Sequence, residues 1–456
     1  MSDTVETQTR DAWGTRAGFI LAAVGSAVGL GNMWRFSYVA AEGGGAAFVM
    51  LYLMFVALIG MPIMTSELIV GRMTQMSPVK ALKELGGKAW TPVGLLFAFC
   101  GFGILSYYSV IAGWTMRYAL DAATGSMSTD AGAYFGAVGT GMPAVVTHLI
   151  FMAITIGIVA VGIKKGLERA AIILMPLLFL LLIGLAVWAT TLSGGGAGYA
   201  YYLKPQLGEL LNPKIIVDAA GQAFFSLSLG MGALLTYASY LTSKENLAKE
   251  TLTIAASDFG VAFVAGLVVF PIIFHFNLAE TLGLGGELNT DSTVGALFIA
   301  LPPALRSLGR AGDLVVAAFF TMLFFAALTS AISLLEVVVS SVIDSLKWAR
   351  TKAAIVAGVV IAILGLPSAY NLNFLGALDK LVGTTLLMLG GLLICILVGY
   401  KILPEAEKEL GQGMENQQAI AAWRFFVRYV APPILAVVLA FSIPGVIAAF
   451  KALFAG

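Results

Sequence analysis

The sequence predicts an all-α integral membrane protein with about eleven transmembrane helices. Of the 456 residues, 59% are hydrophobic and 11% charged, and the mean hydropathy is +0.93, whereas a soluble domain needs more charge to cover its surface. Apolar stretches of about 20 residues recur, each long enough for a hydrocarbon core of roughly 30 Å. The sequence lacks the short alternating strands typical of a β-barrel. A net charge of +1 without a Lys/Arg-rich arm gives no indication of nucleic-acid binding.

The expected spans follow one another with short connections. They are centred near residues 26, 58, 106, 152, 180, 227, 266, 327, 360, 387 and 439. A cytoplasmic N-terminus places most Lys and Arg residues inside, so the positive-inside rule selects this orientation and puts the C-terminus outside. The polar segments near 123–143, 195–213 and 278–311 are then external loops, and the last of them is compatible with a helical hairpin.

The first and sixth spans contain residues that loosen a helix. "VGSAVGLGNMWRF" (Val24–Phe36) holds three glycines, Asn32 and Arg35, and "AAGQAFFSLSLGMGALLTYASY" (Ala219–Tyr240) is rich in Gly and Ser. Glycine-interrupted spans at matching places of two halves indicate a transporter built from inverted repeats, with a site near the midplane. The alternative is that the glycines only permit close helix packing. That alternative leaves Asn32 and Arg35 unexplained, since both are costly in lipid.

These motifs resemble the neurotransmitter:sodium symporter family, in particular its bacterial amino-acid branch of leucine and tryptophan transporters. The resemblance runs from Arg10 to the last span and includes "EGGGAAF", "GWT", "KGLERAAIILMP", "FFSLSLGMG" and "ALTSAIS". It implies one transmembrane transporter domain over residues 1–456, with helices 1 and 6 unwound. The inverted five-helix repeats would cover about 14–195 and 213–402, and a peripheral helix about 427–451.

The resemblance also implies two sodium ions and no need for chloride. The first ion would bind Ala27, Asn32 through its amide oxygen, Ser226 and Asp258; the second would bind Gly25, Val28, Ala326, Thr329 and Ser330. The carboxylate of Asp258 would take the place of the chloride that animal relatives require. Two plainer interpretations remain open: the hydroxyls of Thr329 and Ser330 bond within their own helix, and Asp258 caps a helix end.

The same resemblance implies a site for an amino acid. Its lining would be Ala27, Leu30, Gly31, Ile104, Tyr108, Phe225, Ser226, Ser228, Met231, Ser330 and Leu334. Monoamine transporters carry an aspartate at the position of Gly29, so glycine there indicates a substrate that brings its own carboxylate. The apolar lining predicts a hydrophobic range that extends from leucine to aromatic amino acids, because an unpaired buried charge costs several kcal/mol.

Two pairs of charges resemble gates on either side of the site. Arg35 and Asp379 would close the outer side, and Arg10 and Asp344 the inner side. Alone, Arg35 would be read as reaching to the interface and Asp379 as pairing with the adjacent Lys380. In the fifth span, Gly166 and Pro176 resemble the ends of a segment that unwinds during transport, and proline weakens a helix by removing a hydrogen bond.

The function that these features indicate is sodium-coupled symport of L-amino acids into the cell by alternating access. No nucleophile–base constellation indicates an enzyme. The alternative function is an amino-acid sensor or channel on the same scaffold, without coupled transport. We expect a multi-pass protein of the plasma (inner) membrane whose partners are the amino acid and lipid, not nucleic acid. The oligomeric state stays open.

Overall fold

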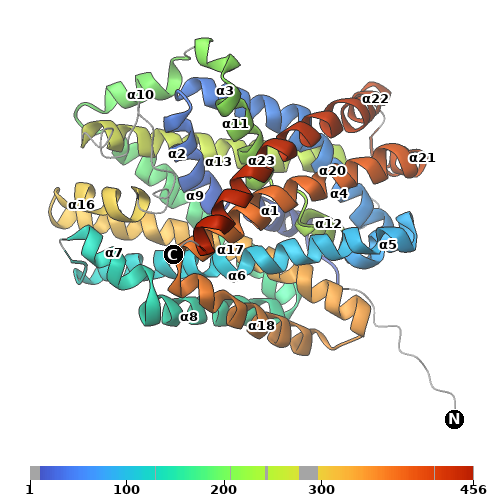
Figure 1. Ribbon diagram of the computed structural model, residues 1–456, viewed down its shortest axis with the longest axis horizontal. Helices are drawn as coiled ribbons and strands as arrows, with labels where there is room; N and C mark the ends of the chain where they lie inside the picture. The colour runs from blue at the N-terminus through green and yellow to red at the C-terminus, as the bar shows by residue number, and fades with distance from the viewer. Residues whose placement is uncertain are drawn as a thin grey trace.

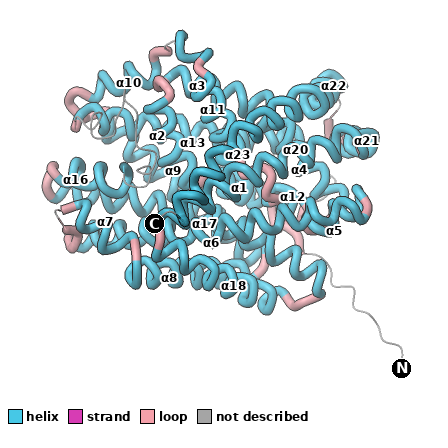
Figure 2. Tube along the Cα trace, in the orientation of Figure 1, coloured by secondary structure: helices cyan, strands magenta, loops and turns pink. Residues whose placement is uncertain are grey.

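The protein is described from a computed structural model that covers residues 11–128, 130–205, 207–241, 245–276, 296–414 and 416–454. Over these residues the chain consists of helices and connecting loops, with no β-strand (Figures 1 and 2). The prediction of an all-α membrane fold is confirmed. The predicted hairpin near 278–311 lies largely outside the described residues, and its end is helical from Ala296 to Arg306.

The helices follow one another along the chain with short 3₁₀ or π-helical turns, labelled η, between them. The first are α1 (Arg16–Ala27), η1 (Gly31–Arg35), α2 (Phe36–Glu42), α3 (Ala46–Phe55), η2 (Val56–Gly60), α4 (Met61–Thr74), α5 (Pro78–Gly86), η3 (Lys88–Trp90), α6 (Thr91–Thr124), α7 (Ala131–Gly139), α8 (Gly141–Val161), η4 (Ile163–Glu168) and α9 (Arg169–Ala189). Next come α10 (Gly195–Leu203), η5 (Leu207–Leu211), α11 (Pro213–Ser226), α12 (Ala233–Ala238) and α13 (Leu247–His275). The last are η7 (Ala296–Ala300), α16 (Leu301–Arg306), α17 (Arg310–Leu346), α18 (Arg350–Tyr370), α19 (Leu372–Leu378), η8 (Asp379–Leu386), α20 (Leu387–Ile396), η9 (Leu397–Lys401), α21 (Leu403–Leu410), α22 (Gln417–Phe425), η10 (Phe426–Val430) and α23 (Ala431–Phe454).

Nine helical stretches in the described part of the chain are long and apolar enough to cross a membrane. They are Ala46–Thr74, Lys88–Thr124, Gly141–Val161, Ile163–Ala189, Leu247–His275, Arg310–Leu346, Arg350–Tyr370, Leu372–Lys401 and Gln417–Leu453. Each contains one of the predicted span centres. The predicted spans near residues 26 and 227 are not among the nine, because each is divided into pieces too short to cross.

The divided helix α1 lies at the centre of the bundle (Figure 1). It packs against α9, α13 and α17, and α17 in turn packs along α6. The C-terminal stretch that ends in α23 lies at the periphery, with 11% of its apolar window buried, against 72% for the stretch that contains α6. The centre of the bundle therefore contains the interrupted helices, and uninterrupted apolar helices surround them.

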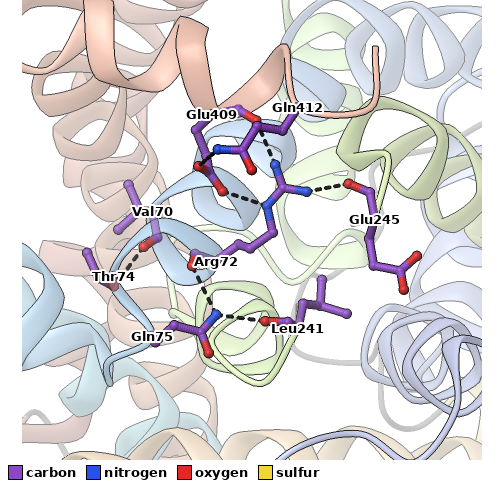
Figure 3. A network of polar contacts seen from close by, with 8 residues as sticks. All are labelled: Val70, Arg72, Thr74, Gln75, Leu241, Glu245, Glu409 and Gln412. Carbon is purple, nitrogen blue, oxygen red and sulfur yellow. Dashed lines mark hydrogen bonds and ion pairs between the residues drawn. The ribbon is translucent and has the colours of Figure 1, made fainter. Parts of the chain in front are cut away.

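A buried arginine joins three elements at one end of the bundle (Figure 3). The Nε atom of Arg72, at the end of α4, donates to Glu409 Oε1 of α21 at 2.6 Å, and its Nη2 donates to the Glu409 carbonyl at 2.6 Å. Its Nη1 donates to the carbonyl of Glu245, in the segment that precedes α13. Because the Arg72 side chain is 1% exposed, its charge depends on these partners for solvation.

Candidate functional site

A cavity lies where the two interrupted helices meet α6 and α17. It is small in this structure, with a volume of about 30 Å³, and uncharged residues line it. All eleven residues expected to hold an amino acid are among the lining residues, and the structure adds Ser26, Gly29 and Ser333. The lining residues come from segments as far apart in the chain as Ser26 and Leu334. The fold therefore brings together residues that the sequence alone could group only by resemblance.

The interruption of α1 exposes backbone groups to this cavity. The helix ends at Ala27, Val28 is extended with ψ 98°, and η1 begins at Gly31. The carbonyl of Ser26 is thereby free to accept the hydroxyl of Ser228 at 2.8 Å. Position 29 has little room for a side chain, because a Cβ on Gly29 would lie 2.7 Å from Ser330 Oγ.

The interruption after α11 is built in a different way. Ser228, Gly230 and Gly232 have positive φ values of 53°, 77° and 76°. Glycine is required at 230, since a Cβ there would lie 1.9 Å from a carbonyl oxygen of α20. The buried carboxylate of Glu67 accepts the Gly230 N–H through Oε1 at 2.7 Å, whereas its Oε2 has no hydrogen-bond partner. Glu67 was not predicted from the sequence, although a lone acid in an apolar span is itself a signal of a polar partner.

The proposed ligands of the first ion form a buried cluster around Asp258. Its carboxylate accepts Ser226 Oγ at 2.9 Å and 3.1 Å, Tyr52 OH at 3.0 Å and Asn32 Nδ2 at 2.6 Å. The amide oxygen of Asn32 instead accepts the Gly29 N–H at 3.0 Å. The structure therefore differs from the expectation that this oxygen faces the ion. The reason is that an acidic group attracts the NH₂ side of the amide.

The proposed ligands of the second ion lie between α1 and α17. Ser330 Oγ donates to the carbonyls of Gly25 and Ser26 at 3.3 Å each. Thr329 Oγ1 donates within its own helix, to Ala326 O at 3.0 Å and Phe325 O at 3.2 Å, as the plainer interpretation of this residue held. The side chain of Thr329 still faces α1, because a Cβ on Gly25 would lie 3.0 Å from Thr329 Cβ. Val28, whose carbonyl completes the expected set, is buried in the break of α1.

One end of the cavity is suited to a carboxylate. The Tyr108 hydroxyl lies 3.4 Å from the Leu30 N–H, and both groups line the cavity. The break in α1 leaves the Leu30 N–H with the Tyr108 hydroxyl in place of a helical acceptor, and such N–H groups attract anions. The ring of Phe225 lines the same cavity, close to Gly31.

The expected outer gate is not closed by an ion pair between its two charged groups. Within the part of the chain that the structure describes, Arg35 and Asp379 do not pair with each other. The guanidinium of Arg35 lies 4.9 Å from the centre of the Phe225 ring, and its Nη1 is buried without a hydrogen-bond partner. The carboxylate of Asp379 accepts the Tyr107 hydroxyl at 2.8 Å. The two charges thus have separate partners.

The expected inner gate can be followed only in part. Arg10 lies outside the described residues, and Asp344 accepts the Ser77 N–H at 2.7 Å. A second charge pair, not predicted from the sequence, lies nearby: Arg350 contacts Glu336 at 2.5 Å. Glu336 also accepts the Tyr240 hydroxyl at 2.6 Å. Its position in the apolar run "SLLEVVVSS" could have predicted a buried partner.

The segment between Gly166 and Pro176 is helical in this structure. It runs from η4 into α9 without a break, and Pro176 lies inside α9. The carboxylate of Glu168, in η4, accepts the Gly14 N–H at 2.6 Å and the Thr15 hydroxyl at 2.7 Å. The residues just before α1 are therefore hydrogen-bonded to the segment between Gly166 and Pro176, for which unwinding is expected.

The chain is similar to known proteins in both sequence and structure. The model described as "Sodium:neurotransmitter symporter family" matches residues 10–133 and 136–451. The uncharacterized sodium-dependent transporter YhdH of Bacillus subtilis is 34% identical over 94% of this chain and 96% of its own length. Sodium-dependent nutrient amino acid transporter 1 of Drosophila melanogaster is 28% identical over 79% of this chain and 66% of its own length. The crystal structure of MhsT in complex with L-phenylalanine superposes with a TM-score of 0.85 at 38% identity, over 95% of this chain and all of that one.

Proposed function

Because this chain belongs to the sodium:neurotransmitter symporter family, whose members are sodium-coupled transporters and not enzymes, we propose that it carries hydrophobic and aromatic L-amino acids into the cell. Transport would be driven by sodium and would proceed by alternating access. The repeats at about 14–195 and 213–402 would move relative to each other, and the helix at about 427–451 would remain outside this motion.

One observation carries the proposal: the cavity combines a backbone-lined end with an apolar wall. The amide of Leu30 and the hydroxyl of Tyr108 would bind the carboxylate, and carbonyls of Ala27, Phe225 and Ser226 the ammonium group. Ile104, Met231 and Leu334 supply apolar lining. No lining residue is charged, so a basic or acidic side chain would be buried unpaired at a cost of several kcal/mol. Phenylalanine in the related MhsT structure supports the same class of substrate.

Two sodium ions would bind beside this cavity. The Asp258 cluster supplies oxygen atoms and a negative charge for the first, and carbonyls of α1 with the hydroxyls of Thr329 and Ser330 supply oxygen atoms for the second. Hard cations favour such ligands. The fixed charge of Asp258 makes chloride unnecessary. In the plasma (inner) membrane, the N-terminus would face the cytoplasm and the C-terminus the outside.

The test is uptake of labelled leucine by proteoliposomes with and without an inward sodium gradient. We expect uptake above equilibrium only with the gradient. Replacing both Thr329 and Ser330 by alanine is expected to abolish the sodium-driven component, whereas Thr253→Ala, which removes an exposed hydroxyl of α13, should leave it unchanged. Leucine binding without sodium-driven accumulation in the unmodified protein would instead support a sensor, and rapid equilibration would support a channel.

A further inference from the structure

Two serines that were not singled out from the sequence form part of the cavity wall. Ser26 lies in the last turn of α1, and Ser333 lies one turn beyond Ser330 on α17. Both line the cavity and are nearly inaccessible in this structure, with 2% and 1% of their surfaces exposed. Since Ser330 is the residue next to Gly29 and Tyr108, Ser333 lies one helical turn away from the end suited to a carboxylate. This position faces the side chain of an amino acid rather than its backbone groups.

Both hydroxyl protons of this pair are engaged within the protein. Ser26 Oγ donates to Ser333 Oγ at 2.7 Å, and Ser333 Oγ donates to the carbonyl of Ser330 at 2.8 Å. A hydroxyl has one proton and two lone pairs. Ser26 therefore keeps two lone pairs, whereas Ser333 accepts from Ser26 and also lies beside the Tyr237 hydroxyl, and both serine protons are engaged. The pair can accept hydrogen bonds from a ligand and cannot give them.

The surroundings make these lone pairs selective. Leu334 is the next residue on α17, and Ile104 of α6 and Met231 also line the cavity, so the nearby side chains are apolar. A ligand without a donor would cover the lone pairs and leave them unsatisfied, which is the costly outcome for a buried polar group. A ligand with a hydrogen-bond donor at the right place would instead satisfy the lone pairs, as water does when no ligand is bound.

Resting on the proposed function, we propose that the Ser26–Ser333 pair selects hydrophobic amino acids whose side chain presents a hydrogen-bond donor. The indole N–H of tryptophan is such a donor on an otherwise apolar ring. Phenylalanine and leucine would still enter, but without this contact.

The test compares tryptophan with 3-benzothienylalanine, in which sulfur replaces the indole N–H and the shape is nearly kept. Both are used to displace labelled leucine from the sodium-loaded protein. We expect tryptophan to bind about three- to tenfold more tightly, the range of one net hydrogen bond. In the double variant Ser26→Ala/Ser333→Ala the two ligands should compete equally. Ser333→Ala alone should reduce the preference, because the Ser26 hydroxyl loses its acceptor and is no longer held in one orientation.

A matched control is available on the same helix. Ser340 of α17 also bonds back to its own helix, donating to Val337 O at 3.1 Å, and it does not line the cavity. Ser340→Ala should keep the full preference for tryptophan. Equal competition by the two ligands in the unmodified protein would overturn this proposal, and this result does not depend on whether the variants fold. The proposed function would still hold. Failure of every hydrophobic amino acid to displace leucine, or to bind at all, would overturn the proposed function itself.

Discussion

At the scale of single residues, Asp258 defines the expected ion requirement. It is fully buried, and Asn32, Ser226 and Tyr52 all donate to it. We expect Asp258→Asn to raise the sodium concentration for half-maximal uptake by about tenfold or more, since contacts to a charged group contribute roughly 1.5–3 kcal/mol. The measurement is leucine uptake against sodium concentration, in chloride and in gluconate. Chloride should partly restore the variant and leave the unmodified protein unaffected.

The control for this substitution is Asp130→Asn. Asp130 is exposed and caps α7 by accepting the Ala133 N–H, and asparagine caps equally well. It should behave like the unmodified protein. Loss of uptake by the unmodified protein in gluconate would show that Asp258 does not replace chloride.

We expect Met231 to determine how large a side chain the cavity accepts. It is unbranched and flexible, so it can repack around ligands of different size, and it lines the cavity beside the positive-φ residues 228 and 230. We expect Met231→Phe to reduce the affinity for tryptophan by about tenfold, as overpacking costs roughly 1–3 kcal/mol, while leucine is affected less. A panel of amino acids competing with labelled leucine measures this. An unchanged ratio of tryptophan to leucine affinity would place Met231 outside the part of the wall that meets the substrate.

The resemblance grouped eleven residues that line one cavity in this structure, because its motifs are long and specific. It could not predict the orientation of the Asn32 amide or the separation of Arg35 from Asp379, since both depend on which partners are nearest in one conformation. Ser26 and Ser333 were missed for another reason. A serine in an apolar span usually bonds to its own helix, so neither residue type nor spacing distinguishes one that faces a cavity.

At the scale of helices, glycine-rich sequence lies where α1 ends and between α11 and α12, but it does not contain what stabilises these interruptions. Tertiary contacts do this: Glu67 of α4 accepts from Gly230, and Ser330 of α17 donates to the carbonyls of Gly25 and Ser26. Such contacts join residues more than 150 positions apart, so a local pattern contains no trace of them. Each interruption of a helix in this protein is therefore held in place by hydrogen bonds to neighbouring helices.

The arginine that links α4, α21 and the segment before α13 provides a test at this scale (Figure 3). We expect Arg72→Met to lower the midpoint of thermal inactivation by several degrees, because removing one partner of a buried pair costs about 3–5 kcal/mol. The matched control is Arg424→Met, whose partner Glu407 lies on the same helix, α21, as Glu409. The Arg424 and Glu407 side chains are 45% and 27% exposed, and exposed pairs contribute little. Equal losses in the two variants would show that the Arg72 network does not fasten these elements together.

At the scale of the whole molecule, the distribution of Lys and Arg residues predicts the orientation of the chain in the membrane. Long α17 joins the two faces: its 37 residues extend about 55 Å at 1.5 Å per residue, more than a hydrocarbon core of roughly 30 Å. Its two ends must therefore emerge on opposite sides. The basic residues Lys347, Arg350 and Lys352 follow its C-terminal end, which the positive-inside rule assigns to the cytoplasm.

Two serines at the ends of α17 allow this orientation to be tested by a nearly isosteric change. Ser307 precedes the helix, Ser345 lies in its last turn, and both are exposed. The native thiols Cys100 and Cys395 are fully buried, so background labelling should be low. In intact cells, a membrane-impermeant maleimide should label Ser307→Cys, whereas Ser345→Cys should react only after permeabilisation. The opposite labelling pattern would show that the protein has the reverse orientation in the membrane. Arg35 and Asp379 would then lie on the cytoplasmic side of the cavity, which contradicts their expected role as the outer gate.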